Sequence, residues 1–460
     1  MASKRTPAAA APAGAGDLTN LEACVHDVAR AFADPDRGPR DLTSFAPLRA
    51  ALVRACTRLP PAYQEAVATP LIATLDGLGP SGLKRLLASD PDRTGSAALL
   101  FDTAQAVLQA GDGAATDAFQ EVVSDLYDGF LSAEDRRGLK PPERFVLAPM
   151  VKWGCPDDGP YTWPVSATTS LGATTGVVNL PPGNARHGLC VWAALGHETA
   201  GHDILGADRG LKSELADAVR RALREAGLTT LAGYWAERID ETASDVLGIL
   251  NMGPAAGFGL LATLRGFRLA SGSGARLQSE GAGDDEHPAD VVRGFLAAAT
   301  IRTLPFGGAT AWAAAVERET QLDAQVIRLS RREVSLAEAR GSAATAARAV
   351  ASSPMRSLEG HALGEIQTWR DRDDAVVARL GAALAGDGKV SVAIQQGDYA
   401  AHAVAAAVTL AVGRGGDPAT LQPRLVTMLA AMHRLNPVWG PLKVFHASDM
   451  TRRPFFTTLD

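Results

Sequence analysis

Two histidines and a glutamate that could support metal-dependent hydrolysis lie in one short segment, His197-Glu198-Thr-Ala-Gly201-His202. A hydrolytic zinc site needs two neutral imidazoles directed at one ion and a carboxylate beside the attacking water. The usual H-E-x-x-H spacing of four residues leaves the two imidazoles only about 40° apart around a helix.

The spacing from His197 to His202 is five residues, which on a regular helix leaves the two rings about 140° apart. The rings can then share an ion only if the helix contains a π-bulge, a distortion found mostly at functional sites. Gly201, immediately before His202, is the residue type that tolerates such a distortion best. The segment 197–202 is therefore either a distorted helical turn that carries a metal site or no metal site at all.

A second segment supplies carboxylates on a predicted helix. Glu237, Glu241 and Asp245 recur every four residues and share one face, beside apolar residues typical of a core. Carboxylates that point inward are costly unless they are paired or bind a metal. Glu237 is expected to be exposed, and Asp240 is an alternative metal ligand if the register differs by one residue.

The two segments together resemble the zinc-binding segments of gluzincin-type metallopeptidases. His197-Glu-Thr-Ala-Gly-His202 is similar to the H-E-x-x-G-H motif of the dipeptidyl peptidase III family. Asp240-Glu-Thr-Ala-Ser-Asp245 is similar to the third-ligand segment N-E-x-x-S-D of the thermolysin form, and more loosely to the E-E-x-x-A-[DE] of dipeptidyl peptidase III. The resemblance covers residues 197–248 of 460 and none of that family's other landmarks, so it implies no exopeptidase specificity.

The resemblance implies a role for each matching residue. His197, His202 and Glu241 would ligate zinc, Glu198 would activate the attacking water, and Asp245 would orient a ligating histidine. It also implies that the strand predicted at 176–180 is an edge strand that pairs with an extended peptide substrate.

A third segment offers a residue for the oxyanion of a tetrahedral intermediate. His287-Pro288, followed by Arg293, resembles the His-Pro-x-x-x-x-Arg segment of prenyl-protein-type zinc endopeptidases. We expect His287 to be the second catalytic residue beside Glu198, with Arg293, His361 and Tyr234 as alternatives for the same role.

The elements that must position these residues are mostly helical. The sequence predicts a mainly α protein with a small β-sheet, an α+β fold with a zincin-like core. Its expected regions are a flexible tail (1–16), an N-terminal helical region (17–142), the zinc-binding core (143–303) and a C-terminal helical region (304–460). Residues 314–340 are expected to form one long charged helix, and residues 271–285 a mobile loop.

Composition excludes several classes of protein. Hydrophobic residues make up 46% of the chain and charged residues 21%, which is an ordinary globular balance. A net charge of -6 gives no basic surface for nucleic acid. No apolar run approaches the about 20 residues of a membrane span, so we expect a cytoplasmic protein with no membrane partner.

The function predicted from these observations is that of a zinc-dependent metallohydrolase, a peptidase that acts on a peptide or protein substrate. Two alternatives remain open. One is a zinc hydrolase of a non-peptide small molecule, and the other is a catalytically silent helical binding protein that keeps a zinc site.

Overall fold

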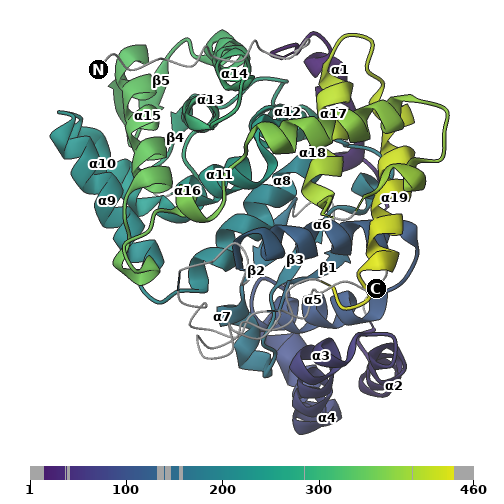
Figure 1. The fold of residues 1–460 in the computed structure, drawn as a ribbon. Coiled ribbons are helices and arrows are strands. Elements are labelled where there is room, and N and C mark those ends of the chain that lie inside the picture. The colour runs from purple at the N-terminus through teal and green to yellow at the C-terminus, as the bar shows by residue number, and fades with distance from the viewer. Residues whose placement is uncertain are drawn as a thin grey trace.

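The computed structural model describes residues 15–36, 38, 42–131, 139, 147–154, 159–283, 285–395 and 397–439 (Figure 1). It confirms a mainly helical fold with small mixed sheets. Most of the predicted flexible tail lies outside the described residues. Within those ranges, no helix combines the length and the apolar character that crossing a membrane requires.

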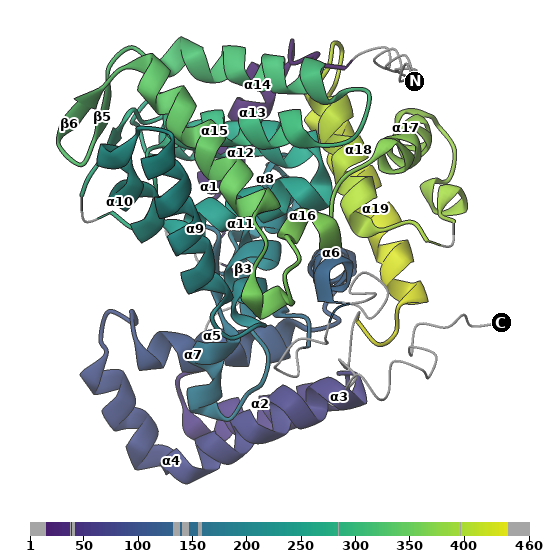
Figure 2. The ribbon, with the colours of Figure 1, turned by 60° about the vertical axis from the view of Figure 1, so that its left-hand side comes forward.

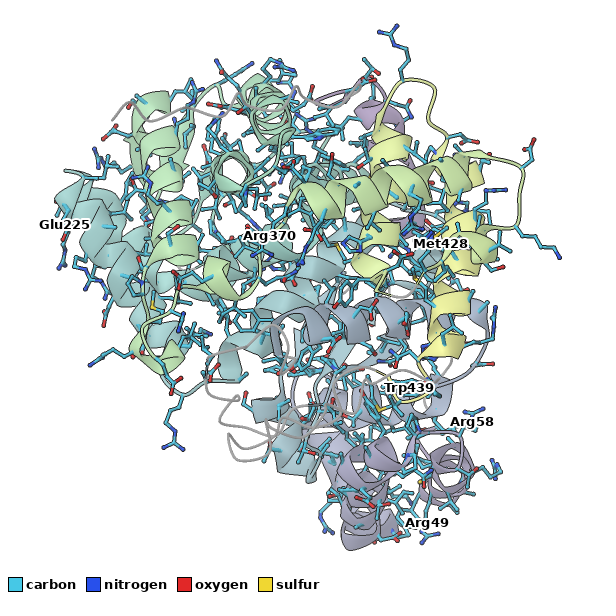
Figure 3. The ribbon with its side chains drawn as sticks, viewed as in Figure 1. Arg49, Arg58, Glu225, Arg370, Met428 and Trp439 are labelled. Atoms are coloured by element: carbon cyan, nitrogen blue, oxygen red, sulfur yellow. The ribbon has the colours of Figure 1, made fainter. Side chains whose placement is uncertain are left out.

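The helices pack around two hydrophobic cores (Figure 2). The small core lies below in that view and contains α2 (Phe45–Cys56), α3 (Pro61–Tyr63), the π-helical η1 (Gln64–Ala68), α4 (Thr69–Ser89) and α5 (Ser96–Gln109). The last described residues also reach it, because the Trp439 ring lies 4.9 Å from that of Tyr63. Figure 3 shows Trp439 beside these helices and Arg49 on their outer side.

The large core holds the remaining long helices. These are α1 (Leu21–Phe32), α6 (Ala114–Leu131), α8 (Val191–His197), α9 (Leu211–Glu225), α10 (Thr229–Glu237), α11 (Ile239–Met252), α12 (Pro254–Ala270), α13 (Asp290–Thr303), α14 (Ala309–Asp323), α15 (Leu336–Ser352), α17 (Asp371–Ala385), α18 (Ala400–Val412) and α19 (Pro418–Leu435). Helices of the predicted N-terminal region thus contribute to both cores. The domain boundaries at 142 and 303 stay a prediction.

A three-stranded sheet separates the two cores. Its order is β1 (Met150–Trp153), β3 (Val177–Leu180), β2 (Tyr161–Trp163), with β3 parallel to β1 and antiparallel to β2. Side chains alternate across it, since Val177 faces the small core whereas Val178 faces the large one. The strand predicted at 176–180 exists, but the expectation that it is the edge strand is wrong. Strand β3 is central and fully buried. Strand β2 lies at an edge of the sheet and contacts the helical segment that carries His197 and His202.

Two predictions about the chain after residue 270 are corrected. The long helix expected at 314–340 is interrupted by the hairpin β5 (Ile327–Leu329) and β6 (Arg332–Val334), because Ser330 and Arg331 adopt positive φ angles and turn the chain back. The expected loop at 271–285 contains a short strand, β4 (Glu280–Gly281), which pairs with β5.

The distorted turn predicted for the histidine motif is confirmed. Helix α8 continues directly into a π-helical segment, η5 (Glu198–Asp203), and that segment packs against α11. In a π-helix the hydrogen bonds run from residue i to i+5, so residues five apart come to lie over one another. His197 and His202 therefore face the same side.

Glycines bring η5 and α8 unusually close to α11. A Cβ atom at Gly196 would lie 3.1 Å from the Cα of Gly248, and a Cβ atom at Gly201 would overlap Ser244. Gly201 is thus required for a close approach of two helices, in addition to the flexibility expected of it. This contact lets short side chains from the two helices meet.

Replacing Gly201 by alanine should destabilise the protein by about 3 kcal/mol, because the added methyl group overpacks the contact with Ser244. Thermal and denaturant unfolding measure this change. Gly206 provides a matched control five residues later, because a Cβ atom there would meet nothing within 4 Å. Gly206→Ala should stay within about 0.5 kcal/mol of the native protein, and equal effects of the two substitutions would contradict the proposed contact.

Candidate metal centre

His197, His202 and Glu241 form a compact cluster, and in the described part of the chain they are a group able to hold a metal ion. The Nε2 atoms of the two imidazoles are 3.2 Å apart. Oε2 of Glu241 lies 3.2 Å from Nε2 of His197, and Oε1 lies 3.4 Å from Nε2 of His202. The structure therefore brings together the three residues predicted as ligands.

These separations fit a shared ion. Ligand atoms bound tetrahedrally to zinc at 2.0–2.1 Å are about 3.3 Å from one another. Oε2 of Glu241 is buried and receives no hydrogen bond from the described residues, and the guanidinium of Arg293 comes no nearer to it than 3.8 Å. A buried carboxylate oxygen in that position is costly unless a cation binds it. The donor set of two imidazoles and one carboxylate thus fits a divalent metal.

Asp245 and Arg293 hold His197 from the side opposite the cluster. Oδ1 of Asp245 lies 2.8 Å from Nδ1 of His197. Arg293 donates hydrogen bonds of 2.8 Å from Nε and Nη2 to the two oxygens of Asp245. A carboxylate on Nδ1 fixes the tautomer that leaves Nε2 free for a metal. Asp245 therefore lies where the resemblance placed it, and Arg293 supports it.

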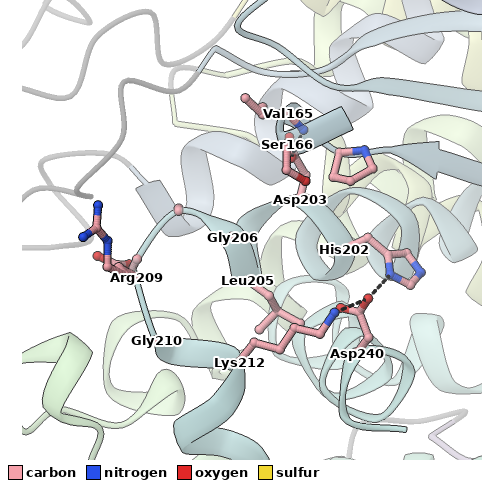
Figure 4. A pocket seen from close by; sticks show the side chains of 13 residues that line it. Val165, Ser166, His202, Asp203, Leu205, Gly206, Arg209, Gly210, Lys212 and Asp240 are labelled. Carbon is pink, nitrogen blue, oxygen red and sulfur yellow. Dashed lines mark hydrogen bonds and ion pairs between the residues drawn. The ribbon is translucent and has the colours of Figure 1, made fainter. Parts of the chain in front are cut away.

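Asp240 occupies the equivalent position behind His202 (Figure 4). Its Oδ2 lies 3.6 Å from Nδ1 of His202 and 2.7 Å from Nζ of Lys212, which α9 contributes. Glu241, not Asp240, belongs to the cluster, so the one-residue alternative in register is wrong. No local signal in the sequence marks Lys212, because its contact with Asp240 of α11 depends on how α9 folds back.

Electrostatics favour positive charge at the centre of the cluster. Burial opposes protonation of His197, but Glu241 and Asp245 outweigh it and raise the pKa of the imidazole to about 10. Burial also opposes ionisation of Glu241, yet His197, Arg293 and His202 hold the pKa of this carboxyl below its usual range.

The count of formal charges around the cluster agrees with this preference. Four carboxylates surround the cluster, those of Glu198, Asp240, Glu241 and Asp245. Lys212 pairs with Asp240, and Arg293 pairs with Asp245 and Glu241. With both imidazoles neutral, as metal ligation requires, the four negative and two positive charges leave an excess of two negative charges. A divalent cation would balance that excess.

Glu198, the predicted general base, follows His197 directly and is held by the edge strand β2. The hydroxyl of Thr162 lies 3.0 Å from both Oε2 and the main-chain oxygen of Glu198. Thr162 was not identified from the sequence, because only the pairing of β2 with β3 turns it toward the motif.

The opposite face of β2 is anchored to the small core through one carboxylate. Asp102 of α5 accepts hydrogen bonds from the Tyr161 hydroxyl (2.6 Å) and the Trp163 indole nitrogen (2.7 Å), and it pairs with Lys152 at 2.5 Å. The small core thereby fixes the strand that holds Glu198.

His287, the second predicted catalytic residue, lies at the edge of the cluster. Its side chain is 57% exposed, and Nε2 is 3.5 Å from Oε2 of Glu241. Arg238 holds the segment that carries it, with donors within hydrogen-bonding distance of the main-chain oxygens of Ala282, Gly283 and His287.

The alternatives to His287 are placed differently. The Tyr234 hydroxyl accepts a hydrogen bond from the main-chain N–H of Ala289, and burial raises its pKa to about 12. Arg293 is bound to Asp245. His361 pairs with Glu365 and lines neither cavity beside the cluster. Of these four residues, His287 is the exposed one at the cluster.

Two cavities adjoin the cluster from different sides. The His197 cavity has a volume of about 400 Å³ and is lined by His197, Glu198, His287 and Arg293, with an apolar wall. The His202 cavity has a volume of about 330 Å³ and is lined by His202, Asp240 and Lys212 together with residues 164–166 (Figure 4). A small molecule or a segment of a larger one can thus reach both imidazoles.

No protein-family model, no curated protein and no solved structure matches the chain. The geometry of the cluster and the motif resemblance are therefore what supports a function.

We expect the purified protein to contain one zinc ion per chain, measured by elemental analysis, and His202→Gln to remove most of it because one of three ligands is lost. Removal of zinc by a chelator should lower the melting temperature, since an ion that binds only the folded state stabilises it. His361→Gln is the matched control and should retain the metal. Equal zinc content in both variants would exclude His202 as a ligand.

Asp245→Asn should weaken zinc affinity by about 10- to 100-fold, because the amide is a poorer acceptor for the Nδ1 hydrogen of His197. Competition with a chelator of known affinity measures the change. Asp76→Asn, which removes an exposed carboxylate paired with Arg49, should leave the affinity unaltered. If Asp245→Asn also leaves it unaltered, Asp245 serves only to hold Arg293.

Proposed function

We propose that this chain is a zinc-dependent metallohydrolase of gluzincin type that cleaves peptide bonds with an activated water. The observation that carries the proposal is the convergence of His197, His202 and Glu241, made possible by the π-helical segment η5. Three protein ligands are typical of catalytic zinc sites, which keep a position for water or substrate, whereas structural sites use four.

A zinc ion held by these residues would polarise the substrate carbonyl and lower the pKa of its water toward about 7. Glu198 is the general base in the proposed reaction. Its carboxylate lines the His197 cavity and receives the Thr162 hydroxyl, which leaves the carboxylate further acceptor sites. Glu198 takes a proton from the attacking water as the water oxygen bonds to the carbonyl carbon.

Collapse of the tetrahedral intermediate completes the proposed reaction. Glu198 passes the proton to the leaving nitrogen as the C–N bond breaks, so water is consumed and no oxidant or reductant is needed. His287 is the residue we assign to the oxyanion, because it is exposed at the cluster and lines the same cavity. One such donor contributes about 3 kcal/mol to a transition state.

Glu198→Gln should lower kcat for peptide hydrolysis by about 10²- to 10⁴-fold while leaving the zinc content at one per chain, because only the proton acceptor is removed. Hydrolysis of casein and of synthetic peptides, with zinc content determined in parallel, measures this. Glu237→Gln removes an exposed carboxylate of α10 and is the matched control. Hydrolysis that survives Glu198→Gln unchanged would exclude this mechanism.

A further inference from the structure

Arg268, near the end of α12, lines the His197 cavity and forms no ion pair with a carboxylate of the described residues. Its Nη1 donates a hydrogen bond of 3.2 Å to Oε1 of Gln278. Its Nε is buried and has no acceptor within the described chain. A guanidinium carries five N–H donors in a planar fork that matches the two oxygens of a carboxylate. Arg268 therefore keeps donors for an anionic group that enters the cavity.

The carboxylates of the same cavity do not balance the charge of Arg268. Glu198 lies at the cluster, where it is the proposed general base. Asp290 binds the main-chain N–H of Gln278 instead of the guanidinium. Burial raises the pKa of the Asp290 carboxyl, and the nearby charge of Arg268 does not reverse this. Three further charged lining residues have a charged side chain or an imidazole beside them: Glu280 has Arg328, Arg293 has Asp245, and Asp285 has His287.

A short path of contacts joins Arg268 to the metal cluster. Gln278 bridges Arg268 to α13, because its Oε1 accepts from Arg268 and its main-chain N–H donates to Asp290 over 2.8 Å. One helical turn after Asp290, about 5.4 Å along the axis, Arg293 places its Nη2 3.4 Å from Nδ1 of His197. An extended peptide covers about 3.5 Å per residue. A peptide bound at the cluster therefore reaches Arg268 within a few residues of the cleaved bond.

The cavity wall strengthens an ion pair with Arg268. Phe32, Leu260 and Leu264 line the same cavity. Water and salt screen charges beside such apolar side chains less than they screen charges on an open surface. A carboxylate that enters the cavity should thus bind Arg268 more tightly than it would bind an exposed arginine.

From this arrangement we infer that Arg268 is a specificity-determining residue that binds a carboxylate of the substrate. The inference rests on the proposed function, and it gives the enzyme a preference for peptides with a negative charge within a few residues of the cleaved bond. Two sources supply such a group, the C-terminus of a peptide and the side chain of an aspartate or glutamate. Both present the two oxygens that a guanidinium fork binds.

Acetylated peptides of one neutral sequence test the inference in three forms: with a free C-terminal carboxylate, with an amidated C-terminus, and amidated with glutamate replacing glutamine at one position at a time. The zinc-loaded protein should cleave a form that carries a carboxylate with kcat/KM at least about tenfold above the neutral amide. Added salt should reduce this preference. The form that is preferred identifies the source of the carboxylate, and mass spectrometry locates the cut. Equal kcat/KM for all forms would overturn this inference and leave the proposed function standing.

Variants of Arg268 test the assignment of the residue. Arg268→Ala should abolish the preference while leaving zinc content and kcat/KM for the neutral amide unchanged. Arg268→Lys should retain part of the preference, because an ammonium group keeps the charge but not the fork. Arg276→Ala is the matched control, since Arg276 is exposed in the following loop and lines neither cavity. A preference that survives Arg268→Ala would overturn the assignment.

Binding measured without turnover separates this inference from the proposed function. Calorimetric titration of the zinc-loaded Glu198→Gln protein should give a Kd about tenfold lower for the preferred form than for the neutral amide. The difference should vanish when Arg268→Ala is added, whereas a carboxylate held by zinc alone would keep its affinity and overturn the inference. If no peptide is cleaved but this difference is present, the proposed function fails and the carboxylate site at Arg268 stands.

Discussion

The whole candidate site depends on one close contact between helices. The segment α8–η5 meets α11 at two points: Gly196 lies against the backbone of Gly248, and Gly201 lies against Ser244. This close approach shortens the distance that the two imidazoles and the carboxylate of Glu241 must span to converge. The π-helical turn is the second part of the same constraint, because it brings the two histidines to the face that meets α11.

Charge is organised in layers around that contact. The inner layer is the cluster of His197, His202 and Glu241, and behind each imidazole stands a carboxylate, Asp245 or Asp240, that is itself paired with a basic side chain. Partners of this kind fix which ring nitrogen is free. A buried set of charges is costly unless every member is compensated. With neutral imidazoles this set carries two more negative than positive charges, and a divalent ion would compensate them.

The small core contributes to the site through the strand it supports. Asp102 holds one face of β2 by Tyr161 and Trp163, and the other face presents Thr162 to Glu198. Alternation of side chains along a strand makes this possible, since adjacent residues point to opposite faces. The helices of the small core thus have a role at a site to which they contribute no ligand.

The sequence by itself determined the elements whose signal is local. The spacing of His197 and His202 predicted a π turn if the two rings share an ion, and the resemblance of 240–245 pointed to Glu241 as the third candidate ligand. Local signals did not reveal that β2 rather than β3 is the edge strand, that 314–340 contains a hairpin, or that Thr162, Asp102, Arg238 and Lys212 surround the site. Strand order and contacts between distant helices depend on long-range packing, which residue spacing does not encode. Only the tertiary structure therefore decided which side chains meet the cluster, because those contacts join segments far apart in the chain.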